Sequence, residues 1–141
     1  MKKMEELQKE YRKMWRRLGF SKPPCELLTK ADNRGGRHVE YKDGKYYWTA
    51  TEYGSWLDFQ ETSRKDEVLE WIALYITEWQ AFGAVQGSGK RGRERDIWQL
   101  AYQIELLQKI NPEWAARHRE KMQAAFPEVA IVPFAAKDFK P

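Results

Sequence analysis

The stretch HVEYKDGKYYWTATE, residues 38–52, decides the fold. Apolar and polar residues alternate on both sides of Asp43-Gly44, as they do in strands that bury one face. Asp-Gly is a preferred pair for a two-residue type I′ turn, because both turn positions need a positive φ. The stretch therefore predicts a β-hairpin. One face of it pairs Val39 with Trp48 and Tyr41 with Tyr46. The other face carries Tyr47, Thr49 and Thr51.

The chain on either side of the hairpin predicts one more strand and one helix. Tyr53-Gly54-Ser55 reads as a second turn, after which residues 56–59 form a third antiparallel strand. Before the hairpin, apolar residues from Met4 to Leu18 recur at steps of three and four, which indicates a helix that ends at Gly19. Residues 21–37 hold two adjacent prolines and two adjacent glycines, so we expect a loop there.

Three further helices are predicted after the sheet. Ser63 is a good N-cap for a helix whose wide apolar face, from Val68 to Phe82, predicts a central core helix that ends near Gly83. Residues 87–93 read as a flexible basic loop, and a third helix runs from about residue 95 to 110. Asn111-Pro112 predicts the cap and first turn of a fourth helix.

These elements predict an α+β fold: an N-terminal helix, a three-stranded antiparallel meander, and three helices packed on the sheet. A length of 141 residues suits a single domain. We expect its core within residues 36–126 and an extended tail from residue 127, which starts a segment with three prolines.

Composition favours an ordinary soluble globular protein. Hydrophobic residues make up 42% of the chain and charged residues 33%, so disorder is expected only at the ends. No apolar run approaches the roughly 20 residues that span a bilayer, and the basic N-terminus has no apolar segment behind it, so neither a membrane span nor a signal peptide is expected. Cys25 is the single cysteine, which suits a reducing cytoplasm.

The aromatic content points to binding more than the charge does. A net charge of +4, from 25 basic and 21 acidic residues, is only mildly basic. Aromatic residues make up 14% of the chain, with seven Trp and seven Tyr. Trp and Tyr dominate the energetic centres of protein interfaces, but they can equally fill an aromatic-rich core. Both interpretations stay open from composition alone.

Reactive groups do not assemble into a recognisable catalytic pattern. The two histidines, His38 and His118, lie eighty positions apart and the chain has one cysteine, so no metal site is expected. Residues 87–90, Gly-Ser-Gly-Lys, resemble the end of a phosphate-binding loop, but Ala84 and Arg91 stand where that motif needs glycine and a hydroxyl residue. We therefore expect no cofactor and no enzymatic activity.

A nucleic-acid-binding or regulatory module is the alternative interpretation. Four basic residues gather in and after the glycine-rich segment, near Trp98, and could contact phosphates: Lys90, Arg91, Arg93 and Arg95. A charge cluster in such a loop is more often a solvated connector. Nucleic acid is therefore the less favoured partner.

Several segments in register resemble the immunity protein 63 family of bacterial polymorphic toxin systems. They are the hairpin at 38–48 with Glu52-Tyr53-Gly54 after it, Arg95-Asp96, residues 104–110 and residues 111–115. The resemblance covers roughly residues 36–125. It implies a cytoplasmic protein that binds the C-terminal domain of a cognate toxin and neutralises it by occlusion, without enzymatic activity or cofactor. Many nuclease inhibitors are acidic; because this chain is basic, we expect an acidic toxin or one that is not a nuclease.

Candidate contacts for such a partner are aromatic residues off the inferred core faces, with two acidic residues to orient them. They are Tyr47 on the outer face of the sheet, Tyr53 and Trp56 at the second turn, Trp98 on the third helix, and the acidic Glu52 and Asp96. The oligomeric state and the identity of the toxin stay open.

Overall fold

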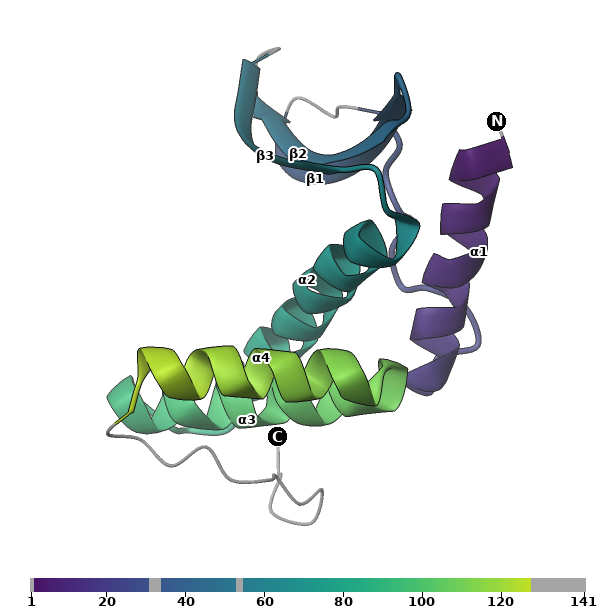
Figure 1. The fold of residues 1–141 in the computed structure, drawn as a ribbon. Helices are drawn as coiled ribbons and strands as arrows, with labels where there is room; N and C mark the ends of the chain where they lie inside the picture. The colour runs from purple at the N-terminus through teal and green to yellow at the C-terminus, as the bar shows by residue number, and fades with distance from the viewer. Residues whose placement is uncertain (1, 31–33, 53–54, 128–141) are drawn as a thin grey trace. The chain divides into compact units, whose positions relative to one another are not determined.

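The computed structural model describes residues 2–30, 34–52 and 55–127, and side chains for all of these except 34, 35, 51, 52 and 55–58. The elements follow in the order α1 (Lys2–Arg17), β1 (Arg34–Lys42), β2 (Lys45–Glu52), β3 (Ser55–Thr62), α2 (Lys65–Gln86), α3 (Gly92–Ile110) and α4 (Pro112–Ala125) (Figure 1). The predicted α+β class and its order of one helix, three strands and three helices are confirmed. The chain divides into two compact units, Met1–Ile72 and Ala73–Pro141, with the boundary inside α2. The expected single domain stays a prediction.

The sheet has the predicted meander topology, with strand order β1-β2-β3 and antiparallel pairing throughout. Asp43 and Gly44 have φ values of 53° and 79°, which confirms the type I′ turn. Tyr41 pairs with Tyr46 as predicted, their ring centroids 4.8 Å apart, and Val39 pairs with Trp48. β1 begins at Arg34, earlier than predicted. Of the predicted second turn, Tyr53 and Gly54 lie outside the described residues.

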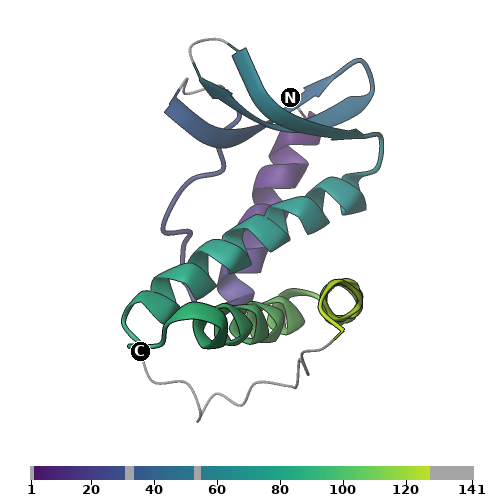
Figure 2. The ribbon, with the colours of Figure 1, turned by 90° about the vertical axis from the view of Figure 1, so that its left-hand side faces the viewer.

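Residues on both faces of the curled sheet (Figure 2) are buried near its centre. On the predicted core face, Val39 and Trp48 are buried. On the opposite face, His38 and Thr49 lie across from each other and are also fully buried. The outer face therefore does not simply face water, as the alternating pattern had suggested.

α1 buries one stripe of residues, Leu7, Tyr11, Met14 and Trp15, and ends as predicted. Gly19 has a φ of 100°, a left-handed conformation that glycine adopts without strain. The Gly19 amide donates to the Arg16 carbonyl and the Phe20 amide to the Trp15 carbonyl, both at 2.9 Å, which is the bonding pattern of a Schellman cap. The Phe20 ring meets the Trp15 ring edge-on at 5.1 Å, so the accompanying apolar contact is present as well.

Hydrogen bonds to the following loop fix α1 within the first unit. The Tyr11 hydroxyl donates to the Cys25 carbonyl at 2.9 Å, and the Gln8 amide donates to the Leu27 carbonyl at 3.1 Å. Burial, together with the hydrogen bond to Cys25, raises the pKa of Tyr11 far above its ordinary value, so this hydroxyl stays a donor. Cys25 itself is exposed.

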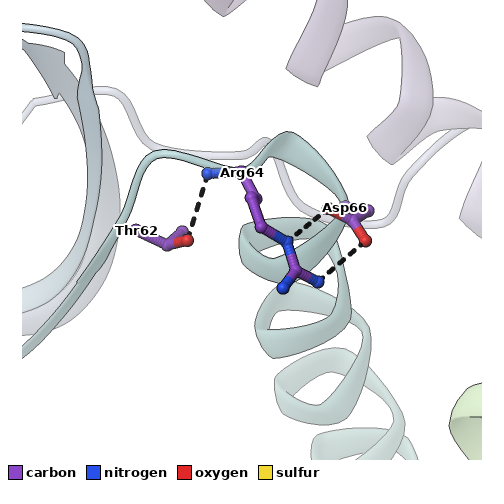
Figure 3. Close-up of polar contacts among 3 residues, drawn as sticks. All are labelled: Thr62, Arg64 and Asp66. Atoms are coloured by element: carbon purple, nitrogen blue, oxygen red, sulfur yellow. Dashed lines mark hydrogen bonds and ion pairs between the residues drawn. The ribbon is translucent and has the colours of Figure 1, made fainter.

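The start of α2 differs from the predicted cap at Ser63. The Arg64 carbonyl accepts the first helical hydrogen bond, from the Val68 amide, so Arg64 occupies the cap position. The Arg64 amide donates to the Thr62 hydroxyl at 3.1 Å, and its guanidinium donates to both carboxylate oxygens of Asp66 at 3.1 and 3.3 Å (Figure 3). This hydrogen bonding lowers the pKa of Asp66 and raises that of Arg64. Side-chain bonding around Arg64 thus takes the place of the Ser63 cap.

The second unit contains the rest of α2 and the helical pair α3–α4, which run side by side in opposite directions (Figure 1). Asn111 caps α4 as predicted: its side chain accepts from the amides of Glu113 and Trp114 at 2.9 and 3.2 Å. Two predicted boundaries were wrong. α2 continues through Gly83 to Gln86, and α3 begins at Gly92, so part of the expected loop is helical.

A chain of hydrogen bonds joins the three helices of this unit. The buried Gln103 of α3 donates to the Leu74 carbonyl of α2 at 3.1 Å and to the Thr77 hydroxyl at 3.4 Å. The Thr77 hydroxyl donates in turn to the Ala73 carbonyl at 2.7 Å. On the other side, the side-chain carbonyl oxygen of Gln103 lies 3.3 Å from Nε2 of His118 on α4 and accepts its hydrogen. Because these groups are held in one arrangement, their hydrogen bonds fix the register of the three helices.

This arrangement predicts that acid weakens the second unit through His118. Burial, and secondarily the charge of Lys121, lowers the pKa of His118 below its usual 6.5. The unfolded chain therefore takes up the proton at a higher pH than the folded chain. The His118 contribution is complete above about pH 6.5 and is lost as the pH falls from there to the lowered pKa. Urea unfolding at about pH 7.5 and about pH 5.5 should show a smaller loss in His118→Gln than in the wild type; equal losses would contradict the prediction.

Candidate interaction surface

In the second unit, α2 buries a face made of small residues. Ala73, Thr77 and Ala81 recur every four residues and are fully buried, and Val85 continues the row with 1% of its surface exposed. Residues at this spacing share one face of a helix. Their small side chains let α3 come close enough for Gln103 to reach the α2 backbone. This row of small side chains is thus the part of α2 that Gln103 of α3 reaches.

Three large aromatic residues lie on another face of the same helix and are open to solvent. Tyr75 is 41% exposed, Trp79 is 51% exposed and Phe82 is 48% exposed. Their spacings of four and three residues align them along the helix. We call these three residues the aromatic stripe. The sequence pattern had assigned them to the core, and the structure corrects that assignment, because the core face of α2 lies elsewhere.

The charge along the aromatic stripe is acidic. Glu78 is exposed and lies three residues after Tyr75 and four before Phe82, which places it on the same face. From Asp66 to Gly89 the chain carries no lysine or arginine. A surface complementary to the stripe would therefore be apolar and carry a positive charge opposite Glu78.

An exposed row of large aromatic residues indicates a binding site more than an ordinary solvent-facing surface. Single exposed apolar residues are ordinary on protein surfaces, but aligned large ones mark interaction sites. Exposed Trp and Tyr side chains bury a large area on binding at a small cost in conformational entropy. A rigid helix with three such anchors can occupy a groove on another protein.

Trp98, one of the predicted contacts, is half-buried at the start of α3. Its ring stacks on Tyr102, with centroids 6.4 Å apart and planes inclined by 23°. The Lys90 ammonium lies 5.4 Å from the Trp98 ring centroid, within cation–π range. Asp96 is exposed, and its carboxylate lies 3.9 Å from the Arg95 guanidinium. The structure therefore brings Lys90 and Trp98 together. Lys90 and Tyr102 both lie against the Trp98 ring and cover part of it.

The remaining predicted contacts fall on the sheet. Tyr47 is half-buried, between Glu40 on β1 and Glu61 on β3. Tyr53 lies outside the described residues, and so do the side chains of Glu52 and Trp56.

The basic residues of the predicted nucleic-acid site are only partly available. Lys90 pairs with Glu94 at 3.1 Å as well as covering Trp98. Arg93 and Arg95 lie on α3 and not in a loop, and Arg91 is the residue that precedes this helix. Lys90 and Arg95 thus each have an acidic neighbour within 4 Å. This pairing does not favour a phosphate-binding surface.

The surface of α4 carries a groove without nucleophilic side chains. An open groove of about 590 Å³ borders α4, and its lining includes Ala115, Ala116, Arg119 and Glu120 but no His, Cys or hydroxyl side chain. Across the described ranges, no three His, Cys, Asp or Glu side chains group as metal ligands would. Within the same ranges, every helix is too short or too polar to cross a bilayer.

Comparison with known proteins adds one match. The family model described as immunity protein 63 matches residues 42–124, more than half of the chain. No curated protein and no solved structure matches. The matched segment runs from the end of β1 to α4 and includes both the aromatic stripe and Trp98. It leaves out α1 and nearly all of β1.

Proposed function

Because the chain belongs to the immunity protein 63 family, we propose that it binds the toxic domain of a cognate bacterial toxin and neutralises it by occlusion. The protein acts in the cytoplasm of the cell that makes the toxin, and it needs neither a catalytic group nor a cofactor. Neutralisation follows from occupancy alone, because a toxin domain whose working surface is covered cannot reach its target.

The aromatic stripe is the observation that carries this proposal. Trp79 and Phe82, each about half-exposed, are the anchors, and Tyr75 extends the contact by one turn. They stand on a helix whose opposite side is fixed by Thr77 and Gln103, so little conformational freedom is lost on binding. The toxin contributes an apolar groove with a basic residue that pairs with Glu78.

The affinity required sets the size of the contact. An immunity protein must remain bound at low concentration, which calls for a Kd near or below the nanomolar range, about −12 kcal/mol. Interfaces of roughly 1,600 Å² reach this value when a few anchors are fully desolvated. The stripe supplies the centre of such an interface. The predicted contacts, Tyr47, Glu52, Tyr53, Trp56, Asp96 and Trp98, stay proposed as further contacts with the toxin.

Expression of the toxic domain in a bacterial host, with and without the chain, tests the proposal. The probe is the C-terminal domain of the toxin encoded next to this chain. Host cells should stop growing when that domain is expressed alone and should grow when the chain is co-expressed. A chain with Trp79→Ala and Phe82→Ala should be made in equal amount and fail to protect. Continued growth arrest in the presence of the wild-type chain would refute the proposal.

A further inference from the structure

α1 carries a row of positive charges on the side away from its buried stripe. Lys9, Arg12 and Arg16 follow one another at steps of three and four residues, and all three are exposed. We call these three residues the cationic face. None of their side chains forms a hydrogen bond or ion pair with another described residue. Lys13, by contrast, pairs with Glu10 at 3.4 Å.

The cationic face is not needed to hold the fold. Like charges three and four residues apart repel each other along a helix, so these neighbours weaken α1. Only Arg16 stands in the last turn, where the helix dipole favours a cation. The packing of α1 depends on its other side, through residues such as Leu7 and Trp15. A row of charges on the open side of α1, whose side chains pair with no described residue, indicates a use outside the chain.

An acidic protein surface suits this row better than a membrane or a nucleic acid does. A basic helix lies on a membrane by inserting its apolar side, but the apolar side of α1 is buried in the protein. A nucleic-acid backbone is uniformly negative, whereas Glu5 continues the row one turn before Lys9 and would face the phosphates. Alternating signs of charge are typical of protein surfaces that select a partner.

We propose that the cationic face docks against an acidic patch of the toxin domain and speeds the association of the two proteins. This inference rests on the proposed function and concerns a surface separate from the aromatic stripe. α1 precedes Lys42, where the family match begins, so the cationic face lies outside the matched residues. The attraction acts before contact and brings the toxin to the chain in a favourable orientation.

Association kinetics test the proposal. The chain is immobilised, and an inactivated form of the toxin C-terminal domain is the probe, at about 50 mM and about 300 mM NaCl. In the variant Lys9→Gln, Arg12→Gln, Arg16→Gln the association rate should fall about tenfold at low salt, with the dissociation rate changed less than about threefold. The difference between variant and wild type should shrink at high salt, because salt screens exposed charges.

A second triple variant separates the position of the charge from its amount. Lys30→Gln, Lys42→Gln, Lys109→Gln removes the same charge from exposed positions off α1 and should keep an association rate within about twofold of wild type. Equal slowing in both variants would overturn the proposal and leave toxin binding intact. Absence of wild-type binding would instead show that the proposed function fails. Binding of a single-stranded RNA of about 20 nucleotides that is lost in the α1 variant would assign the cationic face to nucleic acid and also overturn the proposal.

Discussion

Trp79→Ala is expected to weaken toxin binding by about 2–4 kcal/mol, or roughly 30- to 700-fold in Kd. Trp79 is the most exposed member of the aromatic stripe, at 51%. Its ring is therefore available to a partner, and truncation removes a large apolar area from the contact. Isothermal titration of the inactivated toxin domain with each variant measures the change directly.

Phe126 provides the matched control for this prediction. It is 47% exposed, similar to the stripe residues, but it lies at the end of α4. Phe126→Ala should leave Kd within about twofold of wild type, because scattered exposed residues contribute little to binding. If Trp79→Ala and Phe126→Ala bind the toxin equally well, the aromatic stripe is not the interface.

Trp15→Ala is expected to lower the free energy of unfolding by about 3–5 kcal/mol, which is a large share of a typical total. The Trp15 side chain is fully buried and its ring meets the Tyr11 and Phe20 rings edge-on, at 6.3 and 5.1 Å between centroids. Its truncation leaves a cavity and removes the apolar contact that closes the C-terminal cap of α1. Urea unfolding followed by far-ultraviolet circular dichroism reports the loss.

The same substitution at Trp79 serves as the comparison for stability. Because that side chain is half-exposed, its removal should change the free energy of unfolding by no more than about 1 kcal/mol. The two substitutions thus affect different properties. Trp15→Ala should lower stability, and Trp79→Ala should weaken binding. A large loss of stability in Trp79→Ala would mean that the stripe serves the fold.

The hairpin and the cap of α4 could be predicted from sequence because each depends on local chemistry. Asp43-Gly44 supplies the two positive φ values of the turn, and alternation around it fixes which residues pair. The Asn111 side chain accepts the hydrogen bonds of the cap, and the proline after it starts the first turn of the helix. Such signals act over a few positions and do not depend on the rest of the fold.

The faces of α2 could not be predicted in this way. The helix is apolar nearly all round, so periodicity does not distinguish the packed side from the open one. Periodicity predicts Tyr75, Trp79 and Phe82 to be core, because large apolar residues usually are. One usable signal is a row of small residues. Ala73, Thr77 and Ala81 recur every four residues, and small side chains at that spacing allow a second helix to come close.

The helix boundaries near glycine were wrong for a related reason. Gly83 and Gly92 were taken to end or exclude a helix, yet α2 runs through the first and α3 begins at the second. A glycine costs a helix only about 1 kcal/mol. Packing of the second unit, with Gln103 bonded to Leu74 and Thr77, supports the helices beyond their local preferences.

Titration of toxin activity with the purified chain tests most directly the claim that binding alone neutralises the toxin. The toxin domain is held at a concentration far above the expected Kd, and its activity is followed as the chain is added. Our account predicts a linear fall to zero that ends at one chain per toxin domain, with full activity recovered when the complex is denatured and the toxin refolded alone. Activity that persists beyond one equivalent, or a toxin left permanently altered after the chain is removed, would contradict it.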